Sequence, residues 1–140
     1  MAKTSHDNGP IHQTLRDVPG LNAADVAALW QKGRVVTVPA GWSMIHQLEP
    51  PDEVYLILQG TVSVDRNHAR LTELGPGEFI GEIAPIAHRL RTATVTARTP
   101  LLTLVLPAAE FAQLCRDLPH FDAAVTAVAT ARLAELDQST

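Results

Sequence analysis

The sequence contains a single cysteine and no long apolar run. Cys115 is the only cysteine among 140 residues, so the chain can form neither an internal disulfide nor a multi-cysteine metal site. No stretch approaches the roughly 20 apolar residues that a membrane-spanning helix needs. The polar run His6–Pro10 stands where a signal peptide would need apolar residues. These absences predict a cytoplasmic protein with no membrane partner.

The sequence also lacks a concentration of charge of one sign. The formal net charge is −4 at pH 7, and acidic and basic residues are interspersed along the chain. Proteins that bind a nucleic-acid backbone carry a basic patch or stripe, so we expect no nucleic-acid partner. Hydrophobic residues make up 46% of the chain, which suffices for one buried core, and the length favours one domain.

Glycine and proline punctuation divides the chain into short elements. Residues 1–20 are polar and turn-forming, which predicts a mobile tail before a domain at residues 21–140. Asn22 can cap a helix that Gly33 ends. Alternating β-branched segments then predict strands at Val35–Val38, Met44–His46, Val54–Leu58, Thr61–Asp65, Arg70–Leu74, Thr92–Ala97 and Leu101–Leu106. A hairpin turn is expected at Asn67, since asparagine tolerates positive φ.

After Pro107 the β pattern ends and two helices are expected. The first covers Ala108–Leu118, Pro119 breaks it, and the second runs from His120 to about Leu136. The elements together predict an α+β fold, an antiparallel β jelly-roll barrel with an N-terminal helix and two C-terminal helices. We expect Trp30, Trp42 and Cys115 to be packing residues.

One segment after the predicted strand at Arg70–Leu74 carries the candidate site. Gly81 leads into a short helical turn whose first N–H groups lack internal partners, and such a terminus binds anions. Arg91 can place a guanidinium against the same anion through charge-assisted hydrogen bonds. Glu82 is an acceptor-only carboxylate, which suits a sugar hydroxyl.

The same segment resembles the phosphate-binding cassette of the cyclic-nucleotide-binding domain family. That family includes the catabolite activator protein, the regulatory subunits of cyclic-AMP-dependent kinase and the cyclic-nucleotide-gated channels. The matching residues are Ile80-Gly81-Glu82-Ile83-Ala84 and Arg91-Thr92-Ala93. Three earlier turns match in register as well, at Val38-Pro39-Ala40-Gly41, Val54-Tyr55-Leu56-Ile57-Leu58-Gln59-Gly60 and Leu74-Gly75-Pro76-Gly77.

The resemblance implies a stand-alone sensor that binds cyclic AMP or cyclic GMP, needs no cofactor and catalyses no reaction. Glu82 is expected to bind the ribose 2′-hydroxyl. Arg91 is expected to bind the exocyclic phosphate oxygens, and the amides of Ile83 and Ala84 are expected to bind the same phosphate. The expected ligand-binding residues are Gly81, Glu82, Ile83, Ala84, Arg91, Thr92, Ala93 and Arg132. The expected output is the C-terminal helix, acting on an unknown effector protein or forming a homodimer.

Arg132 enters this set through a second similarity. The stretch before the last helix resembles the binding domains of bacterial cyclic-nucleotide-gated potassium channels at Phe111, Leu114, Cys115 and Pro119. That similarity implies that Arg132 caps the base of the nucleotide, where a guanidinium can stack on a purine. The alternative is that its stem lies along the barrel while its head reaches water or pairs with Asp122 or Glu135.

Three other classes of function compete with a cyclic-nucleotide sensor. Gly41, His46, Glu53 and Gly60 partly imitate a first cupin motif. A cupin-like jelly-roll metalloenzyme would also need a second closely spaced histidine and a further histidine downstream, whereas His46 is the only histidine in that stretch. A transcription factor would carry a helix-turn-helix after the last helix, and none follows before Thr140. A degenerate module that keeps the fold without binding is the third.

Overall fold

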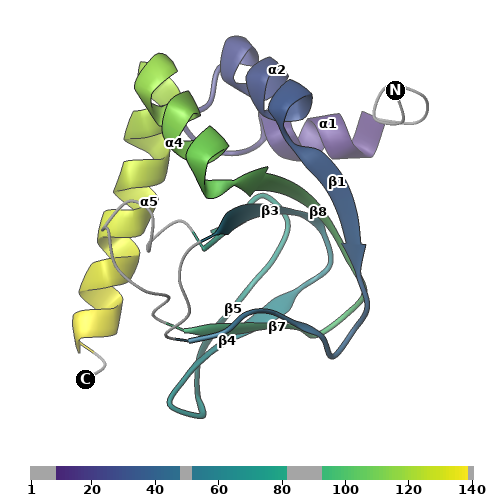
Figure 1. The fold of residues 1–140 in the computed structure, drawn as a ribbon, viewed down its shortest axis with the longest axis vertical. Coiled ribbons are helices and arrows are strands. Elements are labelled where there is room, and N and C mark those ends of the chain that lie inside the picture. The colour runs from purple at the N-terminus through teal and green to yellow at the C-terminus, as the bar shows by residue number, and fades with distance from the viewer. Residues whose placement is uncertain (1–8, 48–51, 82–92, 139–140) are drawn as a thin grey trace.

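The computed structural model describes residues 9–47, 52–81 and 93–138. Its helices are α1 (Gly9–Arg16), α2 (Ala23–Lys32), α4 (Ala108–Asp117) and α5 (Pro119–Gln138). Its strands are β1 (Arg34–Val38), β2 (Ser43–Ile45), β3 (Glu53–Gln59), β4 (Val62–Arg66), β5 (Ala69–Leu74), β6 (Phe79–Ile80), β7 (Thr94–Ala97) and β8 (Leu101–Pro107). The helices gather above and beside the strands (Figure 1).

The described strands form two four-stranded sheets that face each other. One sheet has the order β1-β8-β3-β6 and the other the order β2-β7-β4-β5, and every pairing given for them is antiparallel. The predicted α+β fold with antiparallel strands is thereby confirmed. It is a jelly-roll-like sandwich, since the described strands do not close into one barrel.

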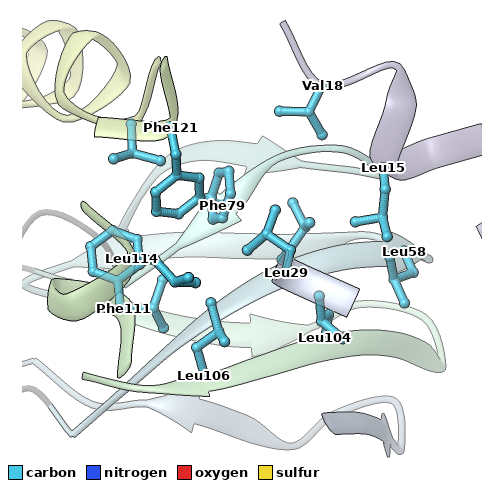
Figure 2. Packing of buried hydrophobic residues seen from close by; sticks show 13 residues of the cluster. Leu15, Val18, Leu29, Leu58, Phe79, Leu104, Leu106, Phe111, Leu114 and Phe121 are labelled. Carbon is cyan, nitrogen blue, oxygen red and sulfur yellow. The ribbon is translucent and has the colours of Figure 1, made fainter. Parts of the chain in front are cut away.

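Two apolar layers hold the sandwich together. The larger layer lies between the helices and the β1-β8-β3-β6 sheet, and Figure 2 shows its side chains, with Phe79, Phe111 and Phe121 grouped at one end. The smaller layer lies between the two sheets and includes Ile57, Ile80 and Val95. The sheet that contains β3 is therefore covered on both faces, which explains why β3 is apolar almost without interruption.

The helix predicted after Asn22 is present and capped at both ends. The Asn22 side chain accepts a hydrogen bond from the Asp25 amide, while the Asp25 carboxylate accepts one from the Asn22 amide. This reciprocal pair satisfies two amides that the first helical turn leaves without partners. Gly33 ends the helix, as predicted, with its N–H donating to the Leu29 carbonyl.

The tail predicted for residues 1–20 is corrected for residues 9–20. Helix α1 starts at Gly9, and the side chain of Leu15 is fully buried in the helix-facing layer together with Val18. Pro10 obscured this helix in the sequence, yet proline is tolerated in a first helical turn because its missing N–H would have no partner there.

The same rule explains the boundary between the last two helices. Pro119 separates α4 from α5, as predicted, and is also the first residue of α5 rather than a residue before it. The hairpin between β4 and β5 turns through Asn67 and His68, which have φ of 54° and 67°. Two consecutive positive φ angles are typical of the tight two-residue turn that fits strand twist.

Candidate functional site

The structure describes some of the predicted ligand-binding residues and not others. Glu82, Ile83, Ala84, Arg91 and Thr92 lie outside the described residues. Gly81, Ala93 and Arg132 lie inside them. The structure therefore describes the two ends of the candidate segment and the predicted capping arginine.

The entry to the segment is strand β6, which the sequence did not predict because it is two residues long. Phe79 and Ile80 pair with Leu56 and Tyr55 of β3 and are 3% and 2% exposed. Phe79 belongs to the helix-facing layer and Ile80 to the layer between the sheets, as the alternation of a strand requires. Strand β6 thus fixes the backbone immediately before Gly81.

Two glycines shape this entry. Gly81 has φ of +86°, a conformation that residues with a Cβ rarely adopt, so glycine is required where the chain leaves β6. The turn before β6 uses Gly77, with φ of +88°, and its N–H donates to the Ile57 carbonyl at 2.8 Å. The Ile57 N–H donates in turn to the Glu78 carbonyl at 3.0 Å, which ties the turn to β3.

The exit of the segment belongs to the opposite sheet. Ala93 is buried, and β7 follows it between β2 and β4. Ala97, the last residue of β7, is hydrogen-bonded to the turn between β1 and β2. Its carbonyl accepts from the Gly41 N–H and its N–H donates to the Trp42 carbonyl, both at 2.8 Å. The chain therefore passes from one sheet to the other between Gly81 and Ala93.

Arg132 of α5 contacts the entry strand. Its Nη1 donates a hydrogen bond to the Phe79 carbonyl, and its Nη2 lies 3.7 Å from a carboxylate oxygen of Glu78. The Arg132 side chain is 18% exposed. Both of these partners come from the barrel, whereas the acidic neighbours considered from the sequence, Asp122 and Glu135, are on the same helix as Arg132. The side chain of Glu135 lies outside the described part of the chain. No periodic pattern links positions 78 and 132, so the sequence carried no signal for this pair.

Phe79 contacts α5 at a second point, through its ring. The rings of Phe79 and Phe121 meet edge to face with centroids 6.0 Å apart, and Phe121 meets Phe111 of α4 in the same way at 5.7 Å. Figure 2 shows the three rings together at one end of the helix-facing layer. Helix α5 therefore contacts the entry strand by apolar packing at its start and by Arg132 eleven residues later.

A shallow groove elsewhere on the molecule involves none of the predicted site residues. It has a volume of about 220 Å³ and lies beside β1 and β2, lined among others by Val36, Met44 and Tyr55. Trp42 lines it as well and is 65% exposed, so the expectation that Trp42 is a packing residue is wrong. It follows Gly41 in the turn between two edge strands, where no layer covers it. Trp30 does pack against the helix-facing layer.

The carboxylate that imitates a cupin ligand has other partners. Glu53 pairs with Arg34 at 2.6 Å and accepts a hydrogen bond from the Tyr55 hydroxyl at 3.1 Å. Within the described ranges, no group of three or more histidine, cysteine, aspartate or glutamate side chains could hold a metal ion. No described helix is both long enough and apolar enough to cross a membrane.

Cys115 lies at the junction of α4 and α5, partly buried against the helix-facing layer. Burial, and to a smaller extent the charge and hydrogen bond of Asp122, raise the pKa of the Cys115 thiol to about 11, against a lowering by Arg116. The thiol is therefore protonated at neutral pH. This agrees with its prediction as a packing residue.

Comparison with known proteins identifies relatives of this chain. A family model described as the cyclic nucleotide-binding domain matches residues 35–117. A cyclic nucleotide-gated potassium channel of Mesorhizobium japonicum is 42% identical over 87 residues, which are 62% of this chain and 24% of the channel. The chain thus spans about a quarter of that relative.

Two solved structures share the fold. The regulatory subunit of a cAMP-independent protein kinase A from Trypanosoma brucei matches with a TM-score of 0.78 at 23% identity, covering 91% of this chain and 47% of that chain. The catabolite activator protein of Thermus thermophilus matches with a TM-score of 0.76 at 27% identity, covering 90% and 61%. The matched family region contains Gly81 and Ala93 and ends before α5.

Proposed function

The chain belongs to the cyclic nucleotide-binding domain family, and we propose that it is a regulatory module that binds cyclic AMP or cyclic GMP and catalyses no reaction. The observation that carries the proposal is the family match over residues 35–117, which includes both ends of the candidate segment. The proposed binding unit comprises residues 21–140, with α1 packed on it through Leu15.

The ligand contacts are assigned by resemblance to the phosphate-binding cassette. Glu82 accepts a hydrogen bond from the ribose 2′-hydroxyl, because a carboxylate is an acceptor only. Arg91 binds the exocyclic phosphate oxygens, supported by the amides of Ile83 and Ala84 and by the Thr92 hydroxyl. Gly81 and Ala93 complete the site at its two ends. The described backbone supports this assignment because β6 and β7 hold those ends in opposite sheets.

Arg132 is the proposed capping residue for the base. Its guanidinium lies against the strand that leads into the candidate segment, bonded to the Phe79 carbonyl. A guanidinium has two flat faces besides its N–H edges, and a face can stack on a purine while the edges keep their hydrogen bonds. This placement supports a role at the ligand over the alternative of a guanidinium in open water.

Signalling is proposed to pass through α5. The helix contacts β6 at both Phe121 and Arg132, so a ligand that displaces this strand changes the contacts of the helix. The effector is a protein that reads the surface of α5, or a second copy of the chain that forms a homodimer through it. The proposal includes no nucleic-acid or membrane partner and no cofactor, and it places the module in the cytoplasm.

Thermal unfolding with added nucleotide tests the proposal. A ligand that binds only the folded state adds RT ln(1 + [L]/Kd), which is about 2.7 kcal/mol at a hundredfold excess over Kd. Cyclic AMP or cyclic GMP should raise the melting temperature, and the linear 5′-monophosphates should raise it much less. An unchanged melting curve in millimolar concentrations of both cyclic nucleotides would instead indicate a module that keeps the fold without binding.

A further inference from the structure

Glu78 contacts both the turn before β6 and the last helix. One carboxylate oxygen accepts a hydrogen bond from the Gly75 N–H at 2.8 Å, and the other lies 3.7 Å from Nη2 of Arg132. The Glu78 backbone is held as well, since its N–H donates to the Gly75 carbonyl at 3.2 Å and its carbonyl accepts from the Ile57 N–H. The turn, and not Arg132, therefore fixes where this carboxylate lies.

Arg132 ends a line of buried residues on α5. Phe121, Val125 and Ala129 are at most 1% exposed and follow one another at a spacing of four residues. Arg132 is three residues further along the same line, and the neighbouring positions Thr130, Ala131 and Ala134 are exposed. Beyond Ala129, Arg132 is thus a described side chain that attaches this helix to the barrel.

The Phe79 and Glu78 contacts of Arg132 contribute different interactions. The Phe79 carbonyl is a neutral acceptor that fixes one N–H edge of the guanidinium. Glu78 supplies a negative charge to the guanidinium of a side chain that is 18% exposed, so burial has removed part of its hydration. Without the carboxylate, we expect the guanidinium to recover hydration by moving outward, and α5 to move with it.

We infer that Glu78 is a positioning residue, which holds Arg132 and the C-terminal part of α5 against strand β6. Its effect on a ligand rests on the proposed function, because it acts through Arg132 as the capping residue. A guanidinium that is oriented before the ligand arrives loses less freedom on binding, which lengthens the lifetime of the complex. The hold on the helix itself can be measured without nucleotide.

Amide hydrogen exchange in nucleotide-free protein tests the hold on the helix. In Glu78→Gln, amides of residues 130–138 should exchange about fivefold faster than in the wild type, the effect of a weak ion pair. Glu73→Gln is the matched control, because Glu73 is similarly exposed and pairs with Arg70 of its own strand. Equal exchange of residues 130–138 in Glu78→Gln and the wild type would overturn the inference.

Dissociation of a fluorescent cyclic AMP analogue tests the effect on the ligand. Glu78→Gln should speed dissociation several-fold with little change in the association rate, and it should add almost nothing in an Arg132→Ala background, because Glu78 acts through Arg132. Additive effects of the two substitutions would contradict a positioning role. If the wild type binds no cyclic nucleotide, the proposed function fails, and hydrogen exchange alone decides whether Glu78 holds the helix.

Discussion

The two halves of α5 attach to the same strand by different chemistry. The first half buries Phe121, Val125 and Ala129, and the Phe121 ring packs against Phe79 of β6 and Phe111 of α4. The second half contacts β6 through Arg132, which meets the Phe79 carbonyl and the Glu78 carboxylate. Figure 1 shows α5 running from this packed end down the side of the sandwich.

This difference predicts that the first half of α5 contributes most to stability, whereas the second half can move more easily. Truncating a fully buried phenylalanine costs about 3–5 kcal/mol, whereas a partly exposed ion pair contributes about 1 kcal/mol or less. The first half of α5 is therefore expected to stay docked under all conditions in which the domain is folded. The second half is held weakly enough for the binding energy of a small ligand to shift it.

The largest effect is expected from the packed half. Phe121→Ala should lower the free energy of unfolding by about 3–5 kcal/mol, because it leaves a buried cavity between the rings of Phe79 and Phe111. Urea unfolding followed by circular dichroism measures the change. Val128→Ala, at an exposed position of the same helix, is the control and should change stability by less than about 0.5 kcal/mol. Similar losses in both variants would remove the distinction between buried and exposed faces.

Arg132→Ala should have a small effect on stability and a larger effect on nucleotide dissociation. Its cost in unfolding free energy should be about 1 kcal/mol or less, since the described contacts that it removes, a hydrogen bond and a partly exposed ion pair, are both weak. Nucleotide dissociation should accelerate by roughly 5- to 30-fold, the equivalent of the 1–2 kcal/mol of a desolvated guanidinium stacked on an aromatic ring. Stopped-flow displacement measures the rate, with Arg116→Ala on α4 as the control. A dissociation rate equal to that of the wild type would return Arg132 to a purely structural role.

The response of the helix to ligand sharpens the comparison further. On addition of cyclic nucleotide, NMR cross-peaks should move throughout residues 125–136, and most for those beyond Ala129, because the described contacts of that part are the polar ones that Arg132 makes. The peaks of residues near Phe121 should move least. Chemical-shift changes confined to the residues around Gly81 and Ala93 would show that α5 is not the output.

The smallest effect is expected from Cys115, at the junction of the packed half with α4. Its pKa is raised to about 11 in the folded protein from an ordinary value of 9.0, so folding favours the protonated thiol. The resulting stability is present below pH 9 and is lost as pH rises through about 11. Because the Cys115 side chain is only partly buried, the loss of unfolding free energy should be small. Comparing the pH dependence of unfolding in the wild type and Cys115→Ala isolates it, and identical curves would contradict the raised pKa.

The sequence predicted most of the fold because its signals were local. Asn22 and Gly33 bound a helix, Asn67 marks a hairpin, and the apolar run in β3 follows from burial on both faces. Helix α1 was missed because Gly9 and Pro10 are read as turn residues, although Leu15 completes the helix-facing layer. Burial of Leu15 depends on residues far along the chain, which no local pattern encodes.

The candidate site was predictable to a smaller extent. The sequence predicted a turn at Gly81, and the φ of +86° at this position explains why a glycine stands there. The pairing of Arg132 with Glu78 could not be predicted, because it joins positions 54 residues apart through a two-residue strand that has no sequence signature. The exposure of Trp42 was also missed, since composition favours burial of a tryptophan and only the edge position of β1 and β2 leaves it uncovered.

Isothermal titration of the wild type and Arg91→Ala with cyclic AMP and cyclic GMP tests the central claim most directly. The account predicts saturable binding of at least one cyclic nucleotide to the wild type, weaker binding of the corresponding linear 5′-monophosphate, and a loss of about 2–5 kcal/mol in Arg91→Ala. Glu82→Ala should lose less. Wild-type affinity in Arg91→Ala, or the absence of binding of either cyclic nucleotide to the wild type, would contradict it.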